Sequence, residues 1–230
     1  MKKTFKFSVI IPFFNEEKTI EKIVRKVHAR KEVDEIVLID DGSKDSSFKK
    51  ASRLNLAKLK IFQHKKNKGK GAAMLTGLRK ASGDVLLFQD ADLECFPSDY
   101  PKLLKPLLEC DADFVIGTRW ENHNGYFLAQ MGNRLLTTII NVLFFTNYRD
   151  AYCGYKLARK EIFTNLGLSS KGFEIEGEIA SKVALKRLRM EQVNVKYKPR
   201  SYKEGKKINY KDVFKGMKKI MEVRTGSLLS

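Results

Sequence analysis

Residues 7–43, FSVIIPFFNEEKTIEKIVRKVHARKEVDEIVLIDDGS, predict a strand, a helix and a second strand. Two apolar runs, 7–12 and 35–40, have the length of strands, and 18–30 carries apolar residues at the spacing of one helical face. A strand that is joined to the next strand by a helix runs parallel to it, through a right-handed crossover. The start of the chain therefore predicts an α/β unit with a parallel sheet.

The same alternation continues to about residue 117. Further strands are expected at 60–64, 84–90 and 114–117, and helices at 46–54, 72–81 and 100–110. From about residue 127 the pattern becomes helical, and 191–197 is compatible with one more strand. This order predicts a Rossmann-like, mainly parallel sheet with helices on both faces.

Size and charge limit the possible functions. The chain has 230 residues, 43% of them hydrophobic, which suffices for one well-packed core. Its formal net charge of +18 indicates an anionic partner: nucleic acid, a membrane surface or a phosphorylated substrate. The total charge does not distinguish among these three.

Cysteines and apolar runs bear on location. Cys95, Cys110 and Cys153 show no CxxC spacing, which disfavours a disulfide framework or zinc site and fits a reducing cytosol. The apolar run at 9–14 is too short for a signal peptide, and 135–145 is shorter than the roughly 20 residues of a membrane-spanning helix. We expect no transmembrane segment.

Polar residues follow three of the expected strands, where ligands bind in open α/β sheets. They are Asn15-Glu16, Asp40-Asp41 and Asp90-Ala91-Asp92. Two of these groups have a structural alternative, since Asn15 also suits a helix N-cap and the paired aspartates before Gly42 also suit a turn. The third group places two carboxylates beside an apolar run, which is unfavourable unless a cation or protons relieve their repulsion.

Several nucleotide and metal motifs are absent. No GxGxxG follows the first strand, and Gly69-Lys70-Gly71 lacks the earlier glycine of a Walker loop. Asp90-Ala91-Asp92 starts like a calcium loop, but Cys95 stands where that loop needs glycine. Mg²⁺ or Mn²⁺ bridging a diphosphate remains the simplest use of the aspartates.

Five ordered motifs resemble family 2 glycosyltransferases of the GT-A fold. They are VIIPFFNEEKTI (9–20), EIVLIDDGSKDSS (35–47), NKGKGAAMLTGL (67–78), DVLLFQDADLE (84–94) and GTRW (117–120). The resemblance continues through GNRLLTTIINVLF, YRDAYCGYKLARKEIF, GFEIEGEI and RSYKEGKKI to about residue 208, and is nearest to the polyprenyl- and dolichyl-phosphate mannosyl- or glucosyltransferases. Gly177 departs from it, because many members have proline there.

The resemblance implies a role for each matching residue. Pro12, Asn15, Glu16 and Ala91 would contact the nucleotide, Asp40 its base, Asp41 the ribose or phosphates, and Lys70 would lie in the nucleotide-side loop. Asp90, Asp92 and Glu94 would reach the metal, while Arg119, Arg134, Arg200 and Lys206 would neutralise donor or acceptor phosphates. The catalytic set would be Asp90, Asp92, Arg119 and Arg134. A plain helix start at Lys70 and solvated surface arginines remain the structural alternatives.

The implied reaction is an inverting transfer of mannose or glucose from GDP-mannose or UDP-glucose to a polyprenyl or dolichyl phosphate. An ionised phosphate acceptor needs no general base. A sugar-hydroxyl acceptor in glycan synthesis is the alternative, with Asp150 as the candidate base. Two other classes stay open, a non-catalytic sugar-nucleotide-binding protein and a nucleic-acid-binding protein. The acids at the ligand edge oppose the last, and we expect no nucleic acid partner.

The end of the chain predicts a basic amphipathic helix. Apolar residues of 208–224 fall on one face and lysines mostly on the other, a pattern typical of contact with an anionic membrane surface. An ordinary helix packed on the domain is the alternative. We expect a catalytic domain at 1–207, a tail at 208–230, and a peripheral location on the cytoplasmic face of a membrane.

Overall fold

The computed structural model describes residues 5–119, 127–200 and 210–226, and the side chains of these except 127–130, 210 and 211. A seven-stranded sheet has the order β3-β2-β1-β4-β6-β5-β7. The strands are β1 (Phe7–Phe13), β2 (Glu35–Asp40), β3 (Leu59–Gln63), β4 (Val85–Phe88), β5 (Phe114–Thr118), β6 (Lys156–Arg159) and β7 (Met190–Asn194). Four of the six neighbouring pairs are parallel, which confirms the predicted mainly parallel sheet.

The strand β6 was not predicted, and it runs antiparallel between β4 and β5. It has four residues and begins with Lys156, so no apolar run marks it in the sequence. Lys156 is nevertheless fully buried, because its ammonium group contacts the carboxylate of Glu176. The sequence pattern therefore missed this strand, because it begins with a charged residue whose charge is neutralised only in the folded protein.

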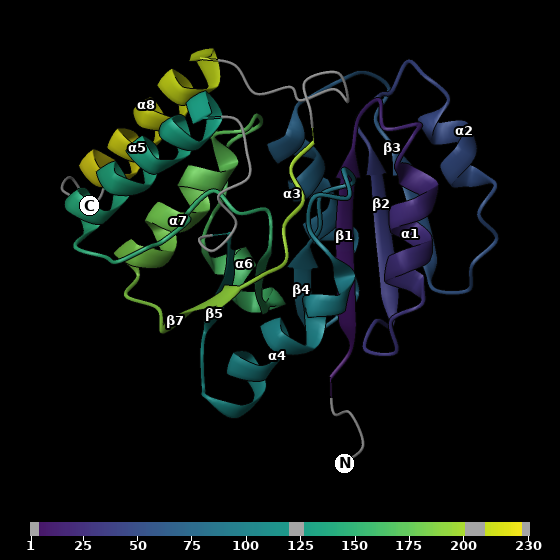
Figure 1. Cartoon of the computed structure of the whole chain (residues 1–230), viewed down its shortest axis with the longest axis horizontal. Coiled ribbons are helices and arrows are strands. Elements are labelled where there is room, and N and C mark those ends of the chain that lie inside the picture. The colour runs from purple at the N-terminus through teal and green to yellow at the C-terminus, as the bar shows by residue number, and fades with distance from the viewer. Residues whose placement is uncertain (1–4, 120–126, 201–209, 227–230) are drawn as a thin grey trace.

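The helices are α1 (Ile20–His28), α2 (Ser47–Ser52), α3 (Lys70–Lys80), α4 (Tyr100–Glu109), α5 (Phe127–Phe144), α6 (Lys160–Asn165), α7 (Ile175–Leu185) and α8 (Tyr210–Gly226), with a 3-10 turn at Pro97–Asp99. They cover both faces of the sheet, as predicted. In β1, Val9 and Ile11 pack with α1 and α4, while Ile10 packs with α3 on the other face. Figure 1 shows α1 and α2 beside the β1–β3 end, and α5, α7 and α8 stacked at the other.

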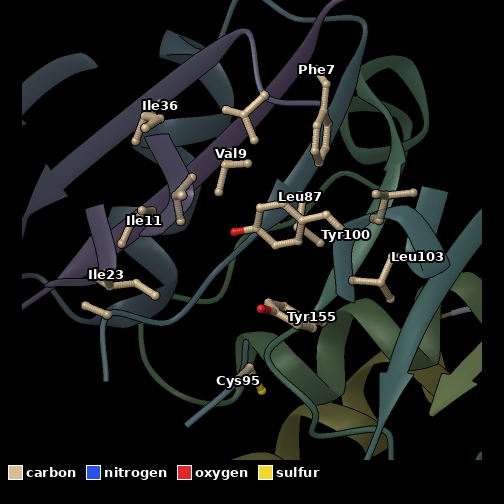
Figure 2. Close-up of a cluster of buried hydrophobic side chains, with 14 of the residues drawn as sticks. Phe7, Val9, Ile11, Ile23, Ile36, Leu87, Cys95, Tyr100, Leu103 and Tyr155 are labelled. Carbon is tan, nitrogen blue, oxygen red and sulfur yellow. The ribbon is translucent and has the colours of Figure 1, made fainter. Parts of the chain in front are cut away.

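One buried hydrophobic cluster, part of which is drawn in Figure 2, includes Phe13 at the end of β1 and Ala91 between Asp90 and Asp92. Tyr100 and Tyr155 pack edge to face with ring centroids 6.0 Å apart. Both hydroxyls donate to Oε1 of Gln89, at 2.8 and 2.7 Å. Because Gln89 is fully buried and directly precedes Asp90, these bonds fix the point from which the Asp-Ala-Asp segment leaves the core.

The C-terminal helix α8 packs on α5 and α7. Ile220 is fully buried and Val213 and Met217 are partly buried in the same core, whereas Phe214 and Met221 of the same apolar stripe are 65% and 45% exposed. Part of the stripe therefore packs on the domain, as in the alternative, and contact of α8 with a membrane stays a prediction. In the described part of the chain, no helix is both long and apolar enough to cross a membrane.

Gly177, the departure from the family pattern, explains how closely α8 approaches. A Cβ atom at this position of α7 would lie 2.4 Å from the hydroxyl of Tyr152 and 3.4 Å from Cγ1 of Ile220 on α8. Glycine therefore gives Tyr152 and α8 the room that a larger residue would take.

Candidate active site

A cavity of about 470 Å³ opens at the carboxyl ends of β1, β2 and β4. Its sheet side is lined by Pro12, Phe13, Phe14, Glu16, Asp41, Asp90, Ala91, Asp92 and Glu94. The remaining lining includes Lys70 and Ala73 of α3, Arg119, Tyr152, residues 172–174 and 176, Arg200, and residues of α5 and α8. The predicted meeting of three acidic segments at one edge is thus confirmed.

A buried chain of alternating charges supports Asp90. The Lys70 ammonium group lies 2.7 Å from Asp90 and 2.8 Å from Glu176. Lys156 contacts the other oxygen of Glu176 and donates to the carbonyl of Cys153 at 2.7 Å. Although burial favours the neutral acid, Lys156 and Lys70 lower the pKa of Glu176 to about 2. Glu176 thus stays ionised and holds Lys70 against Asp90.

Asp92 carries the least favourable charge of the cavity. Burial, together with the carboxylates of Asp90 and Glu94, raises the pKa of Asp92 to about 7, against the opposing effect of Arg200. Arg200 lies 3.4 Å from Asp92, and the backbone N–H of Glu94 donates to Asp92 at 3.0 Å. A divalent cation at Asp92 would relieve this repulsion, so the pair Asp90 and Asp92 fits a metal with oxygen ligands.

Both carboxylate oxygens of Glu94 accept hydrogen bonds from other residues of the protein. One of its oxygens accepts from the backbone N–H of Arg200 and the other from the hydroxyl of Tyr197, both at 2.9 Å. Among the described residues no cluster of three or more His, Cys, Asp or Glu side chains is arranged to hold a metal. The predicted ligand set of Asp90, Asp92 and Glu94 is therefore not preformed, and Glu94 anchors the segment that carries Arg200.

The predicted phosphate-binding arginines of the cavity are paired with carboxylates. Arg119 holds Asp150 through Nε at 2.6 Å and Nη2 at 2.9 Å, and its guanidinium lies over the ring of Tyr197. Arg200 lies 3.0 Å from Glu16. Despite burial, Arg119 keeps the pKa of Asp150 below its usual value, so this carboxylate is a weak base.

Asp41 shapes the loop that leads into α3. Its carboxylate accepts the backbone N–H groups of Lys68 at 2.9 Å and Gly69 at 2.7 Å, and it lies 2.7 Å from Nδ1 of His64. Gly69 has φ +98°, and a Cβ there would lie 2.3 Å from the carbonyl oxygen of Lys171. Only glycine fits this position, which sets Lys70 at the start of the helix.

Three predicted residues lie elsewhere, and a fourth is outside the described residues. Asp40 is fully buried, accepts from Ser43 and Gln63 and does not line the cavity, so its contact with the base stays an untested prediction. Asn15, at φ 54°, accepts the backbone N–H of Lys44 and is absent from the lining, as is the exposed Arg134. Lys206 is the residue that the structure does not describe.

Sequence reasoning missed part of the cavity wall. The residues missed include Asn133, Leu136, Tyr152, Phe173, Glu176, Asp212, Val213 and Lys215. Helical spacing predicts the inward face of α5 and α8, but it does not say which inward residues border a cavity. Glu176 lies between Glu174 and Glu178 in the sequence, and its contact with the buried Lys156 distinguishes it from them.

Comparison with known proteins identifies the family. A model of glycosyl transferase family 2 matches residues 8–167. The chain belongs to this family. A Pyrococcus furiosus protein named dolichol-phosphate mannosyltransferase is 32% identical over 77% of this chain and 53% of its own length. This chain thus spans about half of that relative. A Methanococcus voltae protein named UDP-N-acetylglucosamine–dolichyl-phosphate N-acetylglucosaminyltransferase is 27% identical over 96% of this chain and 97% of its own.

Solved structures confirm the predicted GT-A fold of this family 2 glycosyltransferase. Glucosyl-3-phosphoglycerate synthase from Mycobacterium tuberculosis, crystallised with Mn²⁺, uridine diphosphate and glucosyl-3-phosphoglycerate, superposes with a TM-score of 0.75 at 22% identity. The match covers 97% of this chain and 81% of that one. It includes α8, which lies beyond the region that the family model matches.

The charge chain beneath Asp90 yields a prediction for stability. Glu176→Gln should lower the free energy of unfolding by about 3–5 kcal/mol, because it leaves the buried ammonium group of Lys156 without its counter-charge. Glu174→Gln is the matched control, since within the part of the chain that the structure describes Glu174 accepts one hydrogen bond, from the backbone N–H of Gly172, and makes no ion pair. Urea unfolding at pH 7 measures both, and equal losses would contradict the role given to Glu176.

Proposed function

We propose that this enzyme transfers a hexose, mannose or glucose, from GDP-mannose or UDP-glucose to a polyprenyl or dolichyl phosphate, with inversion. The observation that carries the proposal is the Asp90–Asp92 pair facing one cavity together with Lys70, Arg119 and Arg200. The names of the relatives from Pyrococcus and Methanococcus support the lipid-phosphate acceptor.

On the donor side, Asp92 with Asp90 would hold Mg²⁺ or Mn²⁺. When bound, this metal would neutralise charge on the diphosphate leaving group, where negative charge grows as the glycosidic bond breaks. Lys70 and Arg200 lie against the same two carboxylates, so they are placed to bind phosphate oxygens of the donor. Pro12, Glu16, Asp41 and Ala91 would line the nucleotide.

On the acceptor side, the state of Asp150 favours a phosphate over a sugar hydroxyl. A hydroxyl acceptor needs a general base with a pKa near the working pH. Asp150 is bound at both oxygens by Arg119, and its pKa is lowered. A phosphate monoester is largely dianionic at neutral pH and attacks without a base.

We further propose that the enzyme works peripherally on the cytoplasmic face of a membrane and contacts it through α5. Leu135, Val142 and Phe145 are 52%, 67% and 88% exposed. Leu135 and Val142 are seven residues apart and lie on one face of α5, and Phe145 directly follows the last residue of the helix. A row of exposed large apolar side chains is typical of a lipid or protein contact.

The acceptor assignment predicts the product of an activity assay. Radiolabelled sugar from GDP-mannose or UDP-glucose should enter an organic-extractable product when polyprenyl phosphate is supplied. Asp150→Asn should reduce the rate by far less than the roughly 10²–10⁴-fold expected for loss of a general base. Label that enters only water-soluble oligosaccharide, and disappears in Asp150→Asn, would mean a hydroxyl acceptor instead.

The metal assignment predicts that Asp92→Asn and excess EDTA each abolish most transfer while circular dichroism shows an intact fold. Because only the ionised carboxylate binds a metal, and the pKa of Asp92 is raised to about 7, metal affinity should fall as the pH drops below 7. Added Mn²⁺ should restore the chelated wild type but not the variant. Full activity of Asp92→Asn in EDTA would refute the metal site.

The α5 surface predicts liposome binding. Wild-type protein should float with anionic liposomes, and Val142→Ser/Phe145→Ser should float much less, because both side chains are exposed and their loss leaves the core intact. Leu108→Ser is the control, since Leu108 is 47% exposed on α4. Equal flotation of the two variants would exclude α5 as the contact.

A further inference from the structure

The far wall of the cavity is built where α5 and α8 touch. A Cβ at Gly132 of α5 would lie 3.2 Å from Val213 of α8. A Cβ at Gly216 of α8 would lie 3.0 Å from the hydroxyl of Tyr152 and 3.3 Å from Leu136 of α5. Two glycines thus allow this close contact, and the residues beside them, Asn133 and Lys215, both line the cavity.

The basic side chains of the cavity fall into two groups. Lys70, Arg119 and Arg200 each lie against a carboxylate. Lys215 makes no ion pair with any residue that the structure describes. The side-chain amide of Asn133 makes no hydrogen bond with any of these residues either. Both lie on the helices of the wall, which also carries the carboxylate of Asp212, whereas Asp90 and Asp92 follow a strand of the sheet. This wall therefore offers a cation without an ion pair and an amide without a hydrogen bond among the described residues.

The position of this wall separates it from the donor side. In Figure 1, α5 and α8 occupy one end of the molecule and β2 and β3 the other, with β1 and β4 between them. Asp41 follows β2, and Asp90 and Asp92 follow β4. A ligand bound at Asn133 and Lys215 would thus approach the metal from the side opposite the nucleotide.

We propose that Asn133 and Lys215 form the subsite for the phosphate monoester of the acceptor, with Leu136 and Val213 against its first isoprenoid unit. This deepens the proposed function and rests on it for the identity of the ligand. Lys215 supplies a full positive charge to a dianion, and Asn133 donates through its amide. The apolar neighbours suit a hydrocarbon next to the phosphate, which a free phosphate ion lacks.

In this subsite a binding role falls to α8, a helix outside the region that the family model matches. The family model ends at residue 167, whereas α8 begins at Tyr210. Tyr152 is a positioning residue in this arrangement, because its hydroxyl lies between Gly177 of α7 and Gly216 of α8 and sets how closely α8 approaches. Acceptor affinity should therefore depend on α8 while nucleotide affinity does not.

The test is equilibrium binding of geranyl phosphate, a water-soluble isoprenyl monophosphate, to the full chain by calorimetry without membranes. Lys215→Gln should weaken binding roughly 10- to 100-fold, the usual effect of losing a hydrogen bond to a charged group. Lys215→Arg should stay near wild type. Lys218→Gln is the matched control, as Lys218 is exposed on the same helix and does not line the cavity. Asn133→Asp should weaken the binding of geranyl phosphate more than Lys215→Gln does, because the new carboxylate repels the phosphate.

Three results would overturn the subsite: no binding by the wild type, wild-type affinity in Lys215→Gln, or equal weakening in Lys218→Gln. Inorganic phosphate serves as a second probe, and affinity equal to that of geranyl phosphate would refute the isoprenoid contact. Titration with UDP or GDP should give wild-type affinity in Lys215→Gln. The wild type could fail to transfer sugar and still bind geranyl phosphate in a way that depends on Lys215. This result would refute the proposed function but not the subsite.

Discussion

The structure depends on neutralising several carboxylates that the fold brings to one edge of its sheet. Asp90 and Asp92 leave the end of a buried strand together, and a buried charge without a partner is strongly destabilising. Asp90 is neutralised by Lys70, which is the last member of the ion-pair series Lys156–Glu176–Lys70. Asp92 is partly neutralised by Arg200. The raised pKa of Asp92 indicates that this compensation is incomplete, and a bound cation would complete it.

The two halves of the cavity have different origins. Loops after parallel strands build the half with the carboxylate pair, and their shape is set by backbone bonds such as those of Asp41 with Lys68 and Gly69. Helices α5 and α8 build the other half, through contacts that glycine allows. A reaction that joins a charged donor to a second anion benefits from such a division, because each anion meets its own cations.

Much of the fold and the sheet-edge site could be predicted from the sequence, since period-2 and period-3.6 patterns and the ends of parallel strands carry that information. The prediction failed where tertiary contacts decide. The charged Lys156 at the start of β6 kept this strand from being predicted. Asp40 has the sequence position of a ligand-binding residue, but it is buried and accepts hydrogen bonds from Ser43 and Gln63. The amphipathic pattern of α8 is the same for a packed helix and for a membrane-bound one, and only the structure shows that part of its apolar stripe packs on the domain.

In the proposed function, Asp92 is the metal-binding carboxylate of a sugar-nucleotide site. This role is tested most directly by a crystal structure of the full chain soaked with Mn²⁺ and UDP or GDP, with the metal located by anomalous scattering. We expect one strong peak about 2 Å from the carboxylate of Asp92, in contact with the diphosphate. A peak that lies away from Asp92, or a bound nucleotide without metal at this edge, would contradict the account.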